Sequence, residues 1–389
     1  MDPNDFKNLK TGKVIYDELN DYYHFEPCEL PYEYIPNHKH LALSNDQALS
    51  NVSRLDGLLE NFPNGELDLL ERPFILKEAV LSSEIEGIHT TVSEVMISEK
   101  KKTKEKDTTL EVRNYKAALE YGINKEITEE LILEIHKILL NEVRGQDTTP
   151  GEYKRIQNYI GSKRTELKYA KFVPAAPKRT KMLIRNLVEY INSPQEFPNL
   201  FKIAIIHYQF EVIHPFRDGN GRTGRILIIL LLLKYNILKK PVLYLSEFFN
   251  ERRFEYQDRL YLVSSEGKID DWIKFFLESV DIQSKRAFSF AKKLLDYKKN
   301  LSNYIMDNDE LKPNDKLKII KIIDMLFRNA YIKIKDVESE LEITYPTAKK
   351  LVDELVNLKI IELEEMDKKR DKLYVSNKIL EILDPKNIG

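Results

Sequence analysis

The sequence predicts a mainly α-helical protein, and three observations support this fold class. Glycine and proline are scarce, with 13 and 16 among 389 residues, while 42% of the residues are hydrophobic and 32% are charged. Many stretches space their apolar residues three and four positions apart, as amphipathic helices do. The apolar run Ile226 to Leu233 stands between Arg225 and Lys234, which suits a helix buried on all sides and is too short to cross a bilayer.

Charge and cysteine content narrow the class of protein. A formal net charge of -2 gives the whole chain no attraction to nucleic acid or anionic lipid. The single cysteine, Cys28, excludes an internal disulfide and a cysteine-rich metal site, in keeping with a reducing compartment. The first ten residues lack the apolar core of a signal peptide. We therefore expect a cytoplasmic protein with no membrane association.

The N-terminal third begins with an irregular stretch and continues with helices. Residues 1–40 combine prolines and tyrosines, which predicts a wrapping segment without regular structure. Helical spacing predicts one helix over 41–62 and another over 67–86, the second with Gly87 as its C-cap. Glu86 lies in the last turn, where a carboxylate opposes the helix dipole. It must therefore either point into water or have a cationic partner.

The middle of the chain alternates loops and helices. The charge run at 98–108 predicts a solvated loop, and helical spacing resumes over 111–121. Thr128 is placed as the N-cap of a helix over 128–143. On that helix His136 has leucine and isoleucine neighbours, so we interpret it as a packing residue.

A hairpin and two helices lead to the central stretch. Short β-prone pieces within 153–177 flank Gly161 and a lysine-rich tip, which predicts a hairpin. Helices are predicted over 178–192 and 200–212, and the second delivers the chain to His214. His207 on this apolar helix is interpreted as packing.

Residues 214–225, HPFRDGNGRTGR, predict a phosphate site. Gly219 and Gly221 allow backbone N–H groups to turn inward, and a helix that starts near Asn220 points its positive end at the same place. Arg222 and Arg225 are three residues apart, so they share a helix face and can both reach anionic oxygens.

Asp218 and His214 add chemistry to this site. Asp218 offers the hard oxygen ligand that a phosphate-bound Mg²⁺ prefers, and His214 is a base just outside the turn. Taken singly, a histidine is usually structural and two arginines usually form a solvated face. No packing or turn requirement asks for all of these residues at once, so together they favour a functional site.

The remainder of the chain predicts further helices and a second domain. An aromatic-rich helix is expected over 245–264, a long amphipathic helix over 272–295 and a polar linker over 299–314. Residues 313–389 resemble a winged helix, with helices at 315–328, 334–341 and 344–358, strands at 359–364 and 372–375, and a charged wing tip at 367–371. This region balances 15 Lys and Arg against 15 Asp and Glu. Lys349 and Lys350 could touch phosphates, but a protein-binding or dimerising module fits equally well.

The central stretch matches, position for position, the signature of the Fic family, H-x-F-x-[DE]-G-N-G-R-x-x-R. Ser82, Glu86 and Gly87 match the family's inhibitory motif, [ST]-x-x-x-E-[GN]. The resemblance implies a wrapping segment and inhibitory helix over 1–110, a Fic-type helical catalytic domain over 111–300 with the hairpin as its flap, and the winged-helix-like domain over 313–389. The flap would clamp a target segment by backbone pairing.

The resemblance also implies an activity, the transfer of AMP from ATP to a Ser, Thr or Tyr hydroxyl of a target protein. The chain itself could be such a target. His214 would be the catalytic base, Asp218 would hold Mg²⁺ or Mn²⁺, and Glu86 would inhibit by pairing with Arg225. The residues that the resemblance implies for ATP binding are Gly219, Asn220, Gly221, Arg222, Arg225 and Tyr256.

Two alternatives remain open at the level of sequence. Relatives with the same glutamate can remove AMP from a modified protein, with Glu86 activating water. Alternatively, the chain is a winged-helix regulator whose Fic core only senses nucleotide, and then DNA, a weak candidate on charge grounds, would be its partner. A homodimer is also left open. Gly221 argues against the phosphorylating chemistry of a relative that has lysine at that position.

Overall fold

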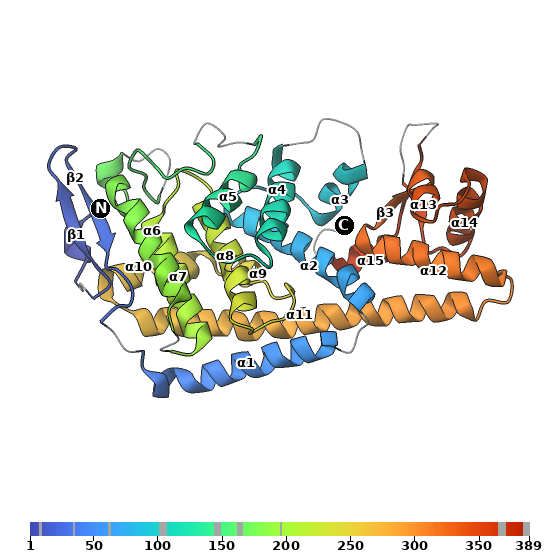
Figure 1. Ribbon diagram of the computed structural model, residues 1–389, viewed down its shortest axis with the longest axis horizontal. Coiled ribbons are helices and arrows are strands. Elements are labelled where there is room, and N and C mark those ends of the chain that lie inside the picture. Colours follow the sequence, from blue (N-terminus) through green and yellow to red (C-terminus); the bar gives the residue numbers. More distant parts are fainter. Residues whose placement is uncertain are drawn as a thin grey trace.

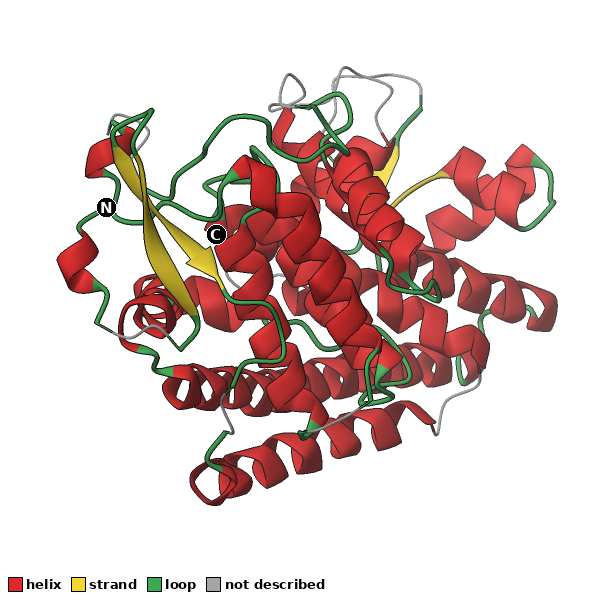
Figure 2. Cartoon of the chain, turned by 60° about the vertical axis from the view of Figure 1, so that its left-hand side comes forward, coloured by secondary structure: helices red, strands yellow, loops and turns green. Residues whose placement is uncertain are grey.

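Helices make up most of the computed structural model, which describes residues 1–7, 10–33, 36–60, 64–100, 107–143, 149–161, 166–194, 197–364 and 371–383 (Figures 1 and 2). The α-helices are α1 (His38–Glu60), α2 (Asn64–Ile85), α3 (Val92–Lys100), α4 (Asp107–Gly122), α5 (Glu129–Leu139), α6 (Pro177–Asn192), α7 (Asn199–Ile213), α8 (Asn220–Lys234), α9 (Ser246–Glu251), α10 (Arg253–Glu266), α11 (Ile269–Met306), α12 (Pro313–Arg328), α13 (Ile334–Glu340), α14 (Tyr345–Asn357) and α15 (Asn377–Leu383). The strands are β1 (Gly12–Asp17), β2 (Tyr22–Pro27), β3 (Tyr331–Lys333), β4 (Glu362–Leu363) and β5 (Leu373–Val375), and the short 3-10 helices are η1 (Pro3–Asp5) and η3 (Leu167–Tyr169). The mainly α fold class is confirmed.

Two buried helices form the centre of the larger part of the molecule. Every residue of α7 from Leu200 to Ile213 is buried, and so is the apolar run of α8 from Ile226 to Leu232. The two helices pack against each other, with α4, α5 and α6 around them. The prediction of a helix buried on all sides is therefore confirmed. Because the turn between α7 and α8 joins two buried helices, the residues on it are held from both sides.

A single long helix, α11, runs beneath most of the other elements, and α1 packs along it (Figure 1). Its 38 residues continue to Met306, so the predicted linker over 299–314 is wrong in its first half. Leu301 and Ile305 explain the difference, since both are buried and lie four residues apart on one face of α11. The polar residues between them are the solvent side of a helix.

The first 40 residues also differ from the prediction, because they contain a β-hairpin. Strands β1 and β2 pair in antiparallel register from Gly12 opposite Pro27 to Asp17 opposite Tyr22. Phe25 is fully buried, and its amide donates to Val173 O at 2.8 Å. The hairpin therefore covers the segment that precedes α6.

Three segments of the middle region differ from the prediction in their secondary structure. The charge run at 98–108 begins within α3 and ends within α4, and residues 101–106 lie outside the described part of the chain. The hairpin predicted over 153–177 has one antiparallel bridge, Ile160 to Phe172, and the helix η3. Residues 162–165 of its tip lie outside the described residues. The aromatic-rich helix is divided into α9 and α10 at Arg252.

The C-terminal part contains the predicted helices and also β3 and α15, which were not predicted. Its three strands form an antiparallel sheet in the order β3-β5-β4. Most of the predicted wing tip, 367–370, lies outside the described residues, so the winged helix stays a prediction. This part contacts the N-terminal helices. Asp336 pairs with Lys100 at 2.7 Å, and the Asn329 side chain donates to Met96 O at 3.2 Å.

Within the ranges that the structure describes, no helix is both long enough and apolar enough to cross a membrane.

Candidate active site

A cavity of about 440 Å³ opens beside the turn between α7 and α8, which is within the range of small-molecule sites. Residues of α2, α7, α8 and α10 line it, together with residues 160–161 and 171–172. The cavity brings together five of the nine residues named from the sequence, which are Glu86, His214, Gly221, Arg225 and Tyr256. The lining residues do not include the other four, Asp218, Gly219, Asn220 and Arg222.

The turn itself is closed by hydrogen bonds from the residue that begins α8. Asn220 Oδ1 accepts from the Phe216 amide at 2.8 Å, and Asn220 Nδ2 donates to Phe216 O at 2.7 Å. Gly219 is the N-cap of α8, with φ at +76°, a conformation that glycine adopts without strain. The side-chain amide of Asn220 thus shapes the turn through both its oxygen and its nitrogen. The first backbone N–H groups of α8 have no acceptor within the helix.

His214 ends α7 and faces the cavity as a neutral imidazole. Its Nδ1 lies 3.2 Å from Glu211 O, which can only accept, so Nδ1 carries the proton and Nε2 keeps its lone pair. Burial, helped by the charge of Lys154, lowers the pKa of His214 to about 4. Above that pH the imidazole is uncharged. Its free nitrogen can therefore accept a proton at neutral pH.

Arg225 is held in place by Ser82 of α2 and by Glu86, the residue that follows α2. Its Nε donates to Ser82 Oγ at 2.7 Å, and its Nη2 donates to Ser82 O at 2.9 Å and to Glu86 Oε1 at 2.8 Å. The Arg225 side chain is 2% exposed, whereas that of Glu86 is 38% exposed. Although burial opposes ionisation of Glu86, the charge of Arg225 and its hydrogen bond hold the pKa of this carboxyl below its usual value. Glu86 is therefore an anion at neutral pH.

The Glu86 carboxylate lies against the N-terminal turn of α8. A Cβ on Gly221 would stand 2.4 Å from Glu86 Oε1 and 2.9 Å from Arg225 Nη1. Only a residue without a side chain allows the carboxylate to come so close. The N-terminal end of a helix favours anions. The predicted phosphate-binding site at the start of α8 thus already has a carboxylate of the same chain beside it.

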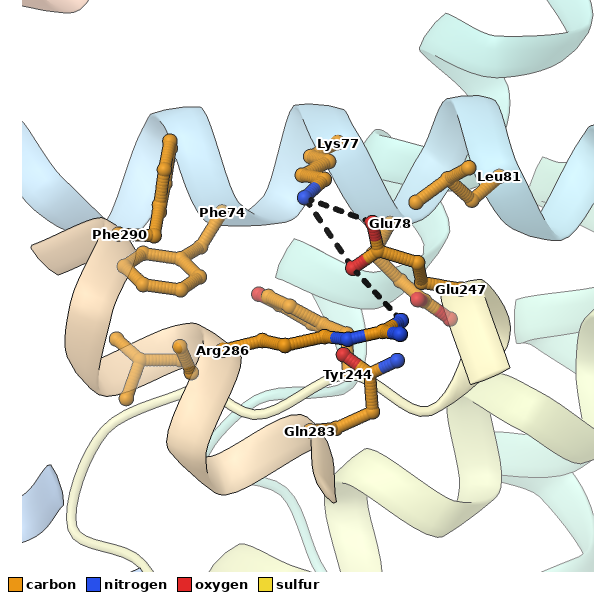
Figure 3. Close-up of a pocket in the computed structure, with 11 residues that line it drawn as sticks. Phe74, Lys77, Glu78, Leu81, Tyr244, Glu247, Gln283, Arg286 and Phe290 are labelled. Carbon is orange, nitrogen blue, oxygen red and sulfur yellow. Dashed lines mark hydrogen bonds and ion pairs between the residues drawn. The ribbon is translucent and has the colours of Figure 1, made fainter. Parts of the chain in front are cut away.

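Polar contacts fix helix α2 about one turn before Ser82, and Figure 3 shows those of Lys77. Glu78 accepts hydrogen bonds from Tyr115 of α4 at 3.1 Å and from Ser246 of α9. Beside it, Glu247 of α9 lies 3.3 Å from Lys77 Nζ and 3.9 Å from Arg286 of α11, as the dashed lines in Figure 3 mark. These contacts set the position of α2 and thereby aim Glu86 at Arg225.

Arg222 lies elsewhere than the sequence suggested. Its Nη1 donates to Glu111 Oε2 at 2.7 Å, and the two side chains are 3% and 2% exposed. Its Nη2 is 3.8 Å from Asp218 Oδ1. Arg222 and Arg225 therefore do not point to one place as predicted, because Arg222 turns toward α4 and Arg225 toward α2.

Asp218 is the candidate metal ligand. Its Oδ1 accepts from the Gly219 amide at 2.6 Å, and its side chain is 49% exposed. In the described part of the chain, no group of three or more His, Cys, Asp or Glu side chains could hold a metal. A single half-exposed carboxylate fits Mg²⁺, which usually keeps several waters and binds through one or two carboxylates together with substrate phosphates.

Tyr256 lies on α10 in the wall of the cavity. Its hydroxyl is 2.8 Å from His207 Nε2, and its ring stacks on Phe249 with 4.5 Å between the ring centroids. His207 is buried, so its interpretation as a packing residue agrees with its place. Burial raises the pKa of the Tyr256 hydroxyl well above its usual range, so Tyr256 contributes an aromatic, uncharged group to a wall that also contains Arg253.

His136 supports the site, and the sequence reasoning missed this. Its ring stacks on Phe216 at 3.7 Å, its Nδ1 accepts from the Gly151 amide at 2.9 Å, and its Nε2 donates to Asp218 O at 3.0 Å. It is a packing residue, as interpreted, but its Nε2 ties the turn to α5 and its Nδ1 holds the Gly151 amide. The signal was absent from the sequence, because the contact joins residues 82 positions apart.

Glu211 is a second residue that the sequence reasoning missed. It lines the cavity and is buried, and burial raises its pKa to about 7. A Cβ on Gly224 would lie 2.3 Å from its Oε1, so Glu211 packs against the glycine between the two arginines.

Two family models match the chain. The Fic/DOC family matches residues 126–232, and the Fic/DOC family N-terminal model matches residues 43–124. The resemblance inferred from residues 214–225 and 82–87 is thus confirmed, and the first model contains the whole turn and α8 up to Leu232.

Two curated relatives show the extent of the similarity. A protein named protein adenylyltransferase Fic from Aedes aegypti is 33% identical over 181 residues, which cover 44% of this chain and 32% of that protein. A probable protein adenylyltransferase from Aquifex aeolicus is 31% identical over 190 residues, 46% of this chain and 52% of that protein. The chain therefore spans about a third to a half of the length of these relatives.

Solved structures agree on the fold. A Fic family protein from Desulfovibrio desulfuricans G20 superposes with a TM-score of 0.54 at 20% identity, covering 89% of this chain and 97% of that one. A Fic domain containing signaling protein from Bacteroides thetaiotaomicron gives a TM-score of 0.51 at 20% identity, covering 63% and 95%.

Proposed function

We propose that this chain, which carries a Fic/DOC domain, is a protein adenylyltransferase that transfers AMP from ATP to a hydroxyl group of a target protein. One observation supports this most strongly. A neutral imidazole, a buried arginine and the N-terminal turn of a helix meet at one cavity, at His214, Arg225 and Gly221. The names of the relatives from Aedes and Aquifex point to the same chemistry.

In the proposed reaction, His214 Nε2 takes the proton from a Ser, Thr or Tyr hydroxyl of the target. The hydroxyl oxygen then bonds to the α-phosphorus of ATP while the bond to the β-phosphate oxygen breaks, so pyrophosphate leaves. The hydrogen bond from Nδ1 to Glu211 O stabilises the imidazolium that forms. A base in this position typically contributes about 10²- to 10⁴-fold in rate.

The phosphates would bind at the start of α8. The backbone N–H groups of Asn220 and Gly221 can donate to phosphate oxygens, whereas that of Gly219 donates to Asp218 Oδ1 and would first have to leave it. Arg225 would hold the γ-phosphate. Mg²⁺ or Mn²⁺ at Asp218 would neutralise charge on the departing pyrophosphate. Arg222 adds positive charge beside Asp218 but is already paired with Glu111.

The rest of the cavity would hold adenosine and the target. Tyr256 offers an aromatic surface for adenine. Ile160 and Phe172, which form an antiparallel bridge, also line the cavity, and the backbone at these residues can pair with a target segment.

We further propose that the resting protein is inhibited by Glu86. This carboxylate pairs with the arginine that the γ-phosphate needs, and it occupies the anion position at the N-terminus of α8. Its side chain is 38% exposed, so it can leave toward solvent without burying a charge. Arg225 would then exchange one anion for another.

Transfer from labelled ATP tests both proposals in three proteins, the wild type, Glu86→Gly, and Glu86→Gly combined with His214→Ala. We expect slow transfer by the wild type, transfer at least about tenfold faster in Glu86→Gly, and a loss of at least about 10²-fold relative to Glu86→Gly when His214→Ala is added. Intact-mass analysis would detect AMP on the chain itself. A rate that His214→Ala leaves unchanged contradicts the transferase, and a rate that Glu86→Gly leaves unchanged contradicts only the inhibition.

Removal of AMP from a modified protein is a second candidate function, favoured by the position of Glu86. Its carboxylate faces the same cavity as His214, so it could activate a water molecule there. Incubating wild type and Glu86→Gly with an AMPylated target separates the two functions. Loss of AMP that depends on Glu86 supports removal, and no loss of AMP argues against it.

A further inference from the structure

The four residues before Arg217 have their carbonyl groups held by one short segment of the chain. Lys154 Nζ donates to Ile213 O at 3.1 Å, and the Lys154 amide donates to Pro215 O at 2.9 Å. Asn158 Nδ2 donates to His214 O at 3.3 Å and to Phe216 O at 2.7 Å. Two residues of the segment leading into the predicted flap thus hold four consecutive carbonyl oxygens around the candidate base.

The conformation of His214 explains why such support is needed. It has φ 48° and ψ 61°, the left-handed region, which non-glycine residues rarely adopt. At the C-terminal end of a helix this conformation is usually left to glycine or asparagine. A histidine stays there only when its surroundings fix the backbone. The strain turns the chain sharply out of α7 and places the imidazole at the cavity.

Lys154 and Asn158 are built as one unit. Lys154 Nζ also donates to Asn158 Oδ1 at 2.9 Å, which orients the amide so that its Nδ2 faces the turn. Lys154 is 4% exposed, and both oxygens that its Nζ contacts are neutral. A buried ammonium group without a carboxylate partner is costly. Such a cost is usually kept where a precise position is required.

We propose that Lys154 and Asn158 are positioning residues that hold His214 in its left-handed conformation and so keep its Nε2 aimed at the hydroxyl to be modified. The inference rests on the proposed function for its kinetic consequence and on geometry alone for its structural one. Neither side chain lines the cavity, so neither is expected to touch ATP. Their loss should therefore lower kcat and leave the KM for ATP nearly unchanged.

The test uses Lys154→Met and Asn158→Leu in the full chain carrying Glu86→Gly. Each variant keeps the size of the side chain but removes its donors. We expect kcat to fall roughly 10- to 100-fold, the effect of misplacing a catalytic group by about an ångström, with the KM for ATP changed by less than about threefold. Because the two residues act on one turn, the double variant should lose little more than the worse single variant.

Gln157→Leu is the matched control. Gln157 lies between the two residues in sequence, and its amide donates to Pro174 O and to Asn158 O instead of to the turn. It should keep the parent's kcat within about twofold. Thermal unfolding of the parent and the four variants corrects each rate for the fraction folded.

Hydrogen exchange at residues 213–217 provides a readout that does not depend on transfer. The amides of His214 and Phe216 donate to Phe210 O and to Asn220 Oδ1, so they should exchange faster in Lys154→Met and Asn158→Leu and not in Gln157→Leu. If the parent transfers no AMP, the proposed function fails, and exchange alone decides on the positioning role. Unchanged exchange overturns the inference, and so does an unchanged kcat in a parent that transfers AMP.

Discussion

Arg222 and Arg225 are three residues apart on α8, yet the structure gives them opposite surroundings. Arg222 is paired with Glu111 of α4, and both side chains are almost completely buried. Arg225 is paired with Glu86, directly after α2, whose side chain is more than a third exposed and lines a cavity. The two ion pairs have nearly the same length, 2.7 and 2.8 Å.

The difference lies in what can replace the carboxylate. The two side chains of the Arg222 pair are only 3% and 2% exposed, so Glu111 has no path into water comparable to that of Glu86. At Arg225, the glutamate can swing into water and an anionic ligand can take its place. Contact distance alone does not distinguish a structural ion pair from an exchangeable one. The two are distinguished by how exposed the carboxylate partner is and by whether a cavity adjoins the pair.

The comparison is tested most strongly by the free energy of unfolding. Glu111→Ala should lower it by about 3–5 kcal/mol, because the variant removes the close partner of a buried guanidinium and leaves only the 3.8 Å contact with Asp218. Glu86→Ala should lower it by no more than about 1 kcal/mol, since water in the cavity can solvate Arg225. Urea denaturation monitored by circular dichroism measures both values.

A matched double variant separates charge from packing in the same experiment. Glu111→Leu with Arg222→Met removes both charges, and it should recover most of the stability lost in Glu111→Ala. Equal losses in Glu111→Ala and Glu86→Ala would contradict the assignment of one pair as structural and the other as exchangeable.

We expect no effect of pH, between about 6 and 8, on the degree of inhibition by Glu86. The pKa of Glu86 is held below its usual value, so its pair with Arg225 is lost only when the pH falls through that low value. The pKa of His214 is lowered to about 4, so the imidazole also stays neutral over this range. The ratio of transfer rates between Glu86→Gly and wild type should therefore be constant.

The neighbouring carboxyl of Glu211 needs to be removed for that measurement. Burial raises its pKa to about 7, and it raises the pKa of Glu78 on α2 to about 7 as well, so both carboxyls would titrate within the range. Both proteins are therefore compared with Glu211→Gln and Glu78→Gln added. A ratio that changes severalfold between pH 6 and 8 in this background would show that the Arg225 pair titrates near neutrality, against the comparison.

Much of the helical fold could be predicted from the sequence. Thr128 caps α5 with its side chain accepting from the Leu131 amide, and Gly87 follows α2 at φ +80°, as the local patterns indicated. The hairpin of β1 and β2 was missed because its prolines and tyrosines resemble a loop, and its burial comes from contacts with a segment about 150 residues away. The end of α11 was missed because a solvent-facing helix surface and a linker have the same polar composition.

The site divided along the same line. Motif spacing correctly brought His214, Arg225 and Glu86 to one cavity. It could not show that Arg222 is occupied, because Glu111 stands 111 residues earlier and no local pattern marks it. His136 and Lys154 were equally invisible, since each acts through the backbone of the turn. Side chains that hold a backbone carbonyl do not form a sequence motif with it.

The central claim is that Glu86 and the γ-phosphate of ATP compete for Arg225. Calorimetric titration of wild type and Glu86→Gly with ATP and with AMP, each carrying His214→Ala to prevent turnover, tests it directly. We predict that Glu86→Gly binds ATP at least about tenfold more tightly, a difference of about 1.4 kcal/mol, and binds AMP as the wild type does. Equal tightening for both nucleotides, or for neither, would contradict the claim.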